Sequence, residues 1–393
     1  MARAQLDAAA TTPLRPEALA AMAPFQSEVF GNPSGGHADA RAAKAALEEA
    51  REHVAAGLGA RPHEVVFTGG GTEADNLAVK GAARAARAAG HGDAVVVTAI
   101  EHKAVLASAD RLEHEGFRVA RTGADRAGIV DLDALAGALD ERTVLVSVML
   151  VNNEVGTVQP LADVARLVRE RAPRAVLHTD AVQGVPWLDV AVATADADLV
   201  AISAHKFGGP KGVGALVVRD QVPLEPLIEG GGQEEGRRSG TSNVPGVVAM
   251  AAALDATLAG RVSEVARVAM LRDRLRARLG RLVAGLVENG DSERKVAGNL
   301  HVGVPGVEAE ALLVLLDQAG IAAAAGSSCA SGATEPSHVL LAMGLSRSEA
   351  ESSIRLSLGF ASSDADVDRA LDAIPAAVDQ LRVAATAPTG GAR

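Results

Sequence analysis

Short apolar runs alternate with amphipathic stretches from about residue 40 to residue 220. The apolar runs are rich in β-branched residues and predict strands at 64–68, 94–99, 143–150, 175–179, 198–203 and 214–218. The stretches between them predict helices at 38–58, 72–88, 102–115, 131–139 and 161–171. Strands that are apolar throughout and separated by helices indicate a mostly parallel sheet covered on both faces. We therefore expect a large α/β domain built as an α/β/α sandwich.

The pattern changes after residue 220. Residues 222–245 are rich in glycine, proline and charge and predict a long ordered loop, and a long helical pattern follows at about 245–285. Strand and helix patterns alternate again at about 290–385, which indicates a second, smaller α/β domain. We predict a large domain at 15–257 and a small domain formed by 1–14 and 258–393.

Composition narrows the class of protein. Of the 393 residues, 48% are hydrophobic and 22% are charged, which is typical of a globular chain. The net charge of −11 gives no overall attraction for nucleic acid, and no apolar run approaches the roughly 20 residues that span a bilayer. A single cysteine excludes an intrachain disulfide and a Cys-rich zinc site. We expect a cytoplasmic protein with no metal site and no direct contact with nucleic acid or membrane.

Ligands of an open parallel sheet bind outside the carboxyl ends of its strands. The first predicted strand is followed by Gly69-Gly70-Gly71-Thr72-Glu73, which opens a helix. A glycine turn at a helix N-terminus can bind a phosphate through free backbone N–H groups. An ordinary strand–helix turn capped by Thr72 is the alternative. The segment matches neither a P-loop nor the GxGxxG fingerprint of dinucleotide-binding proteins.

Four later strand ends also carry polar side chains. His102 follows the second strand, Asn153 the third, Asp180 and Gln183 the fourth, and Lys206 the fifth. Taken singly, each has an ordinary alternative, such as a helix-capping, turn-forming or exposed loop residue. Taken together with the glycine turn, they supply what pyridoxal phosphate requires: an anion site, a carboxylate for the pyridinium nitrogen and a lysine for the aldehyde. The chain has only six lysines, so candidates for the last role are few.

The only cysteine, Cys329, lies in the segment GSSCASGATEP (326–336). A lone cysteine is more often a small buried apolar residue. No large apolar residue lies within five positions of this one, however, and such a composition predicts an accessible loop. We therefore expect Cys329 to be a reactive thiol.

Several long motifs resemble the NifS/IscS-like cysteine desulfurases, a branch of the class V aminotransferases. The resemblance covers nearly the whole chain, from LDAAATTP (6–13) to SIRLSLG (353–359). The motifs between these two are FGNPS (30–34), VFTGGGTEADNLA (66–78), EHKAV (101–105), VNNEVGTVQP (151–160), DAVQ (180–183), SAHKFGGPKGVGAL (203–216), GGGQEEGRRSGT (230–241) and GSSCASGATEPSHVL (326–340).

The resemblance implies a PLP-dependent transferase of fold type I, a homodimer, and pyridoxal 5'-phosphate as its cofactor. It implies that Lys206 bonds the cofactor aldehyde, Asp180 pairs with the pyridinium nitrogen and Gln183 hydrogen-bonds the ring hydroxyl. His102 would stack on the ring and assist proton transfer. The phosphate would be held by the Gly71 backbone and by Thr72, Ser203 and His205, with Thr241 reaching the phosphate of the neighbouring subunit.

The resemblance also implies a reaction. Sulfur would be removed from L-cysteine, leaving L-alanine and a persulfide on Cys329, whose thiolate is the nucleophile. Asn153 would lie beside the cofactor and help to hold the substrate. Arg355 would bind the carboxylate of the substrate. Asn32 would lie near the same carboxylate. The sulfur would then pass to an acceptor protein, an iron–sulfur scaffold or a tRNA thiolase, between which the sequence does not choose.

Some positions depart from the commoner motifs. Gln5 and Ala8 stand where an aromatic residue or histidine often flanks Asp7, and Glu235 stands where arginine is common. None of these changes removes a predicted cofactor residue or the nucleophile. Alternatives on the same scaffold are a selenocysteine lyase, a cysteine-sulfinate desulfinase or a true aminotransferase, and a non-catalytic sulfur-relay subunit is a further one. Cys329 favours the desulfurase, and Lys206 with Asp180 favours an enzyme.

Overall fold

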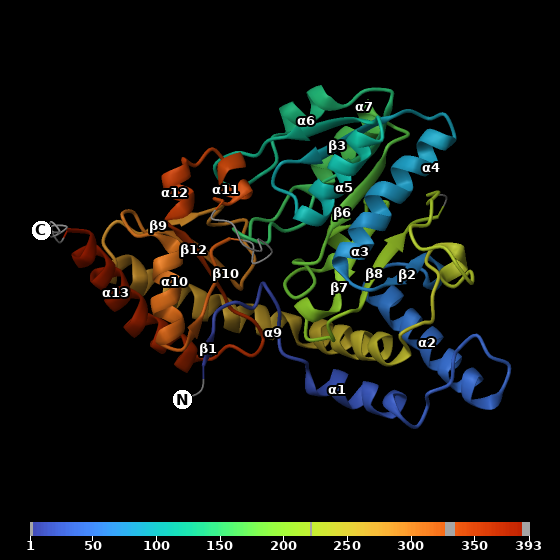
Figure 1. The fold of residues 1–393 in the computed structure, drawn as a ribbon, viewed down its shortest axis with the longest axis horizontal. Coiled ribbons are helices and arrows are strands. Elements are labelled where there is room, and N and C mark those ends of the chain that lie inside the picture. The colour runs from blue at the N-terminus through green and yellow to red at the C-terminus, as the bar shows by residue number, and fades with distance from the viewer. Residues whose placement is uncertain (1–2, 221, 327–334, 387–393) are drawn as a thin grey trace, which may run out of the picture.

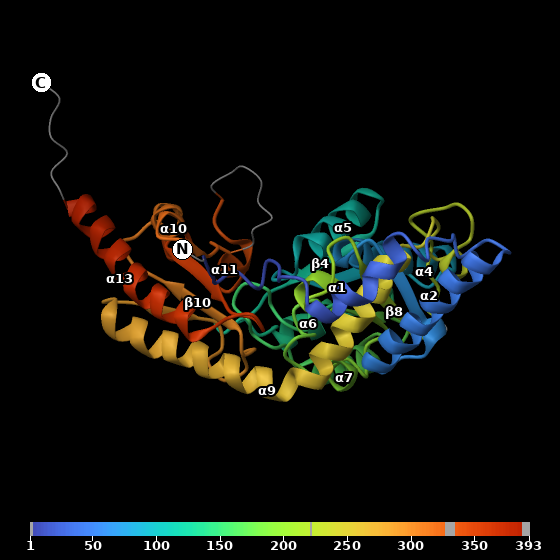
Figure 2. The same cartoon turned by 90° about the horizontal axis from the view of Figure 1, so that it is seen from below.

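Two lobes of unequal size lie side by side in the protein (Figure 1). The structure is a computed structural model that describes residues 3–220, 222–326 and 335–386. A long helix, α9 (Val244–Leu282), runs along both lobes (Figures 1 and 2).

A seven-stranded sheet forms the centre of the large lobe, in the order β2-β8-β7-β6-β5-β3-β4. Only β8 runs antiparallel to its neighbours, β2 and β7, so the expected mostly parallel sheet is confirmed. The edge strand β4 was not expected, because its sequence, RVART, lacks an apolar run. The strands are β2 (Val65–Thr68), β3 (Ala94–Thr98), β4 (Arg118–Thr122), β5 (Thr143–Ser147), β6 (Val176–Asp180), β7 (Leu199–Ser203) and β8 (Gly214–Val218).

Helices cover both faces of this sheet, because successive strand residues point to opposite sides. Val65 and Phe67 pack in one core with α2, α7 and the first half of α9, whereas Val66 packs in a second core with α3 to α5. The helices of this lobe are α1 (Pro16–Met22), α2 (Ala38–Gly57), α3 (Gly71–Asn76), the π-helical η3 (Leu77–Gly81), α4 (Ala82–Ala88), α5 (Lys103–His114), α6 (Leu132–Ala138), α7 (Leu161–Arg171) and α8 (Val190–Ala193). Short 3₁₀ turns are η1 (Ala23–Gln26), η2 (Pro62–Glu64), η4 (Ala204–Lys206) and η5 (Glu234–Gly236).

The small lobe has its own core beneath an antiparallel sheet of order β12-β10-β9. The N-terminal strand β1 pairs in parallel with β11, which ties the start of the chain to this lobe. Its strands are β1 (Ala4–Gln5), β9 (Val287–Asn289), β10 (Asn299–Gly303), β11 (Ile321–Ala322) and β12 (Ser353–Ser357). Its helices are α10 (Ala309–Gln318), α11 (His338–Ala342), α12 (Arg347–Glu351) and α13 (Asp364–Thr386).

Helix α9 belongs to both lobes. Its buried apolar residues up to Leu254 lie in the large-lobe core, and its buried apolar residues from Val268 onward lie in the small-lobe core. The domain boundary predicted at 257/258 therefore falls inside a continuous helix. By length and composition alone α9 could cross a membrane, and the burial of its apolar residues in two cores explains that composition.

Candidate active site

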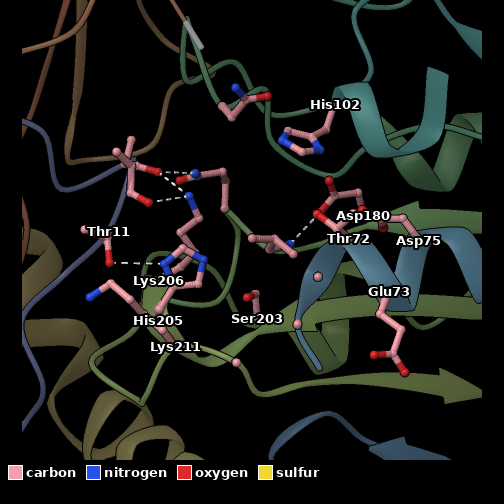
Figure 3. Close-up of a pocket in the computed structure, with 18 of the residues that line it drawn as sticks. Thr11, Thr72, Glu73, Asp75, His102, Asp180, Ser203, His205, Lys206 and Lys211 are labelled. Carbon is pink, nitrogen blue, oxygen red and sulfur yellow. Dashed lines mark hydrogen bonds between the residues drawn. The ribbon is translucent and has the colours of Figure 1, made fainter. Parts of the chain in front are cut away.

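A cavity of about 460 Å³ lies at the carboxyl ends of the large-lobe strands and reaches Arg355 of the small lobe. Strands that end at one edge of a parallel sheet bring their following residues together. Figure 3 shows these side chains converging on one space. Of the predicted residues, the cavity is lined by Gly71, Thr72, His102, Asn153, Asp180, Gln183, Ser203, His205, Lys206 and Arg355.

The glycine turn forms one wall of the cavity. Gly70 has a φ of 144°, which favours glycine, and a helical run begins at Gly71. A side chain at Gly71 would place its Cβ 2.9 Å from Val182 Cγ2 and 3.2 Å from Ser203 Cβ. The first N–H groups of a helix have no partner within the helix. Here they lie, with the hydroxyls of Thr72 and Ser203, around a space that an anion can fill.

His205 and Lys211 stand near this wall. Burial, with Lys206 and Lys211 nearby, lowers the pKa of His205 to about 4, so the imidazole is neutral at physiological pH. Its Nδ1 lies 3.1 Å from Thr11 Oγ1. Lys211 is exposed, and it also lines the cavity.

Asp180 ends β6 and forms the floor of the cavity. Its Oδ1 accepts a hydrogen bond of 2.9 Å from the Val182 N–H. Burial raises the pKa of Asp180, while the neighbouring His102 and Lys206 act in the opposite direction. A buried carboxylate of this kind is stabilised by a cation, and a protonated ring nitrogen is such a cation.

Two further buried carboxyls that sequence reasoning missed stand near Asp180. Glu101 Oε1 accepts hydrogen bonds from Thr98 Oγ1 at 2.9 Å and from the Met149 N–H at 2.8 Å. Burial, and then the charge of Asp180, raises the pKa of Glu101 to about 8. Burial followed by the same charge raises the pKa of Asp75 well above its usual range. The available signal was a carboxylate in each of two motifs that follow apolar strands, Asp75 in VFTGGGTEADNLA (66–78) and Glu101 in EHKAV (101–105).

Asp75, His102 and Asp180 also bring potential metal-ligand atoms within 4.8 Å of one another. The same His102 and Asp180 face the space that a cofactor ring requires. This set therefore belongs to the cofactor site.

Lys206 lies in the turn after β7, and its ammonium group enters the cavity (Figure 3). Its Nζ donates hydrogen bonds to the carbonyls of Ala9 at 2.6 Å and Ala10 at 2.9 Å. Gln183 Nε2 donates to the same Ala9 carbonyl at 2.8 Å. His102 caps α5, and its Nδ1 accepts a hydrogen bond of 3.1 Å from the Ala104 N–H.

Arg355, on β12, closes the cavity from the small lobe. Its side chain is 2% exposed, and it donates to the Asn153 carbonyl and to Asp7 Oδ1, both at 2.8 Å. Asn153 Oδ1 is buried with no hydrogen-bond partner among the described residues. A buried guanidinium beside an unsatisfied amide oxygen is suited to a ligand with both a carboxylate and an amino group.

Two predicted residues stand apart from the cavity. Asn32 and Thr241 are exposed and do not line it. Cys329 lies outside the described residues. The described residue Gly326, three positions before it, lies against the carboxylate of Glu154, the neighbour of Asn153.

The residues present fit pyridoxal phosphate. The glycine turn offers an anion site, the buried Asp180 offers a carboxylate, and Lys206 offers an amine, all facing one cavity. The orphaned Asn153 Oδ1 adds a polar group that requires a partner there.

Comparisons with known proteins agree with this geometry. Residues 4–370 match the aminotransferase class-V family. An IscS-like cysteine desulfurase of Mycobacterium tuberculosis is 45% identical over 99% of this chain and 100% of its own. The structure of a NifS-like protein has a TM-score of 0.90 and 36% identity, covering 96% of this chain and 100% of that one.

A third similar structure is titled "SspA in complex with cysteine". It has a TM-score of 0.78 and 33% identity, covering 91% of this chain and 99% of that one. The chain therefore belongs to the class V aminotransferases, a pyridoxal phosphate-dependent family, and within them to the NifS/IscS-like cysteine desulfurases.

Proposed function

We propose that the protein is a cysteine desulfurase that converts L-cysteine to L-alanine and collects the sulfur as a persulfide on Cys329. The observation that carries this proposal is the convergence of Lys206, Asp180 and Arg355 on one cavity. Curated relatives named cysteine desulfurase and a similar structure holding cysteine support the choice of substrate.

Each residue of the cavity has a task in this reaction. The bound cofactor supplies an electron sink for negative charge at the substrate Cα. Asp180 would hold the protonated ring nitrogen, because its buried carboxylate needs a cation. Lys206 Nζ would hold the cofactor aldehyde and accept the Cα proton.

His102 would stack on the ring and move protons. Because its Nδ1 accepts the Ala104 N–H, the neutral imidazole carries its proton on Nε2. That proton can be donated to a sulfur or carbon atom of the substrate and later be replaced from solvent.

Arg355 and Asn153 would orient the substrate through its carboxylate and amino group. Cys329 then attacks the substrate sulfur as a thiolate, so that an S–S bond forms and the Cβ–S bond breaks. The electron pair of the broken bond stays with carbon, which takes up a proton to give alanine.

The protein is further proposed to act as a homodimer. Two predicted residues, Asn32 and Thr241, are exposed and outside the cavity of their own chain, as expected if each serves a second copy. Phe30, beside Asn32, is 74% exposed, which is unusual for an aromatic side chain. Light scattering on the purified holoenzyme tests this, and a monomer with full activity would contradict it.

The sulfur acceptor is proposed to be an iron–sulfur scaffold or a tRNA thiolase, and the place of action the cytoplasm. A reducing compartment suits a protein whose one cysteine must stay a free thiol between turnovers.

The function is tested by supplying L-cysteine and a thiol reductant to the holoenzyme and measuring alanine and sulfide. We expect the two products in equal amounts, and we expect Cys329→Ser to lose both while retaining the cofactor's visible absorption. Full activity of Cys329→Ser would instead indicate a lyase, the nearest rival on this scaffold.

A further inference from the structure

Arg355 is held in a network that already contains a carboxylate. Its guanidinium donates to Asp7 Oδ1 and to the Asn153 carbonyl, while its Nε has no hydrogen-bond partner among the described residues. A guanidinium that is 2% exposed is strongly destabilised without a counter-charge. Asp7 supplies that charge in the structure described here.

Asp7 is less buried than the arginine that it neutralises. Its side chain is 23% exposed, so water can solvate the carboxylate if it leaves Arg355. A second carboxylate arriving at Arg355 would repel Asp7, because two like charges within a few ångströms disfavour each other. The two carboxylates therefore compete for one guanidinium.

We propose that Asp7 is the resting counter-ion of Arg355, which gives way to the substrate carboxylate and thereby sets the affinity for the substrate. Asp7 is thus a positioning residue that acts through Arg355. The inference rests on the proposed function, because it takes Arg355 as the substrate-carboxylate site.

Asp7 also begins a segment, the N-terminal strap (residues 7–12), that links the two lobes at the cavity. On the small-lobe side, the Ala8 N–H donates to the Ser357 carbonyl at 3.0 Å and the Ala9 N–H donates to Ser357 Oγ at 2.9 Å. On the large-lobe side, the Thr12 N–H donates to the His205 carbonyl at 3.0 Å.

Between these two anchors, the strap carbonyls hold the catalytic amine. Ala9 and Ala10 accept the hydrogen bonds of Lys206. Displacement of Asp7 loosens the strap at its first residue, two positions before Ala9. Arrival of the substrate carboxylate at Arg355 is thereby linked, through one short segment, to the backbone that lies against Lys206.

The test measures binding of L-alanine, the proposed product, to the holoenzyme by calorimetry. Because Asp7→Asn removes the competing charge, we expect L-alanine to bind about fivefold to tenfold more tightly than to the wild type. Asp7→Glu, which keeps the charge, should retain the wild-type affinity. Unchanged or weaker binding to Asp7→Asn would overturn the proposal.

Glu288→Gln is a matched control. Glu288 pairs with Lys295 in the same lobe, and the side chains are 22% and 2% exposed, almost as for Asp7 and Arg355. Neither residue lines the cavity. We expect this control to lower thermal stability as Asp7→Asn does, with no change in L-alanine affinity; tighter binding to the control would also overturn the proposal.

Two further measurements separate the outcomes. If Arg355→Ala binds L-alanine as tightly as the wild type does, the carboxylate site of the proposed function is wrong. If Arg355→Ala weakens binding while Asp7→Asn fails to tighten it, that site stands and only the role of Asp7 is wrong. A measurement on the wild-type holoenzyme depends on no variant. Hydrogen exchange of the strap should accelerate when L-alanine binds, and slower or unchanged exchange would contradict the release of Asp7 from Arg355.

Discussion

Glu101→Gln should make the protein less sensitive to high pH. Burial and the charge of Asp180 raise the pKa of Glu101 from 4.5 to about 8. The unfolded chain ionises this carboxyl at the lower value, so folding requires it to remain protonated over the range between the two. Stability is therefore lost as the pH rises from 4.5 through 8, and a neutral glutamine removes that loss.

The size of the effect follows from the same shift. A rise of about 3.5 pH units at 1.36 kcal/mol per unit corresponds to at most about 5 kcal/mol at pH 9. About 2 kcal/mol of this is already lost at pH 6, so roughly 3 kcal/mol separates the two pH values. The glutamine keeps the shape of the side chain, and its oxygen can still accept the Met149 N–H.

Thermal unfolding of the cofactor-free protein at pH 6 and pH 9 measures this. We expect the midpoint of the wild type to fall about 4 °C further than that of Glu101→Gln between these pH values. Glu64→Gln is the control: although burial acts the other way, hydrogen bonds from Arg61 and from the Asp220 N–H lower the pKa of Glu64. That variant should be destabilised at both pH values. Parallel pH curves for the wild type and Glu101→Gln would refute the reasoning.

Three other variants test the site and its frame. Lys206→Ala should lose at least about a thousandfold in turnover and the visible band of the lysine-bound cofactor, measured by absorption, and a retained band would contradict its role. Gly71→Ala places a methyl group 3.2 Å from Ser203 Cβ. We expect it to weaken cofactor binding about tenfold in a fluorescence titration, and an affinity equal to that of the wild type would exclude this turn as the phosphate site. Arg51 pairs with the buried Glu234 carboxylate at 2.8 Å, and Arg51→Met leaves that carboxylate without its cation. We expect the free energy of unfolding, measured with denaturant, to fall by about 3 kcal/mol. A fall below about 1 kcal/mol would show that the pair is dispensable.

Much of the large lobe could be predicted because its pattern is local. The helix expected at 161–171 is α7 (Leu161–Arg171), and the strand expected at 214–218 is β8. The polar residues after the apolar strands meet in one cavity, because parallel strands end at a common edge of the sheet.

Other features depend on contacts between distant parts of the chain. Ala4 pairs with Ile321 in the β1–β11 sheet, and no local pattern in so short a strand indicates that partner. The edge strand β4 lacks the apolar run by which the other strands of its sheet were recognised. The boundary predicted at 257/258 already divides the helix expected at 245–285, but the apolar residues of α9 carry no mark of which core each one enters.

The candidate site was incomplete for the same reason. Asp75 and Glu101 are buried only because the sheet, α3 and α5 close around them, and their raised pKa values follow from that burial. The contacts of Lys206 with Ala9 and Ala10 join residues that are nearly two hundred positions apart. The motif containing Asp7 was recognised, but its contact with Arg355 required the folded structure.

The measurement that tests the central claim most directly is a single turnover of the holoenzyme with L-cysteine and no reductant. Alanine is counted per active site, and the mass of the peptide that contains Cys329 is determined. We expect about one alanine for each sulfur atom added to Cys329. Alanine without added sulfur on that peptide, or neither product from protein shown to hold its cofactor, would contradict the proposed desulfurase.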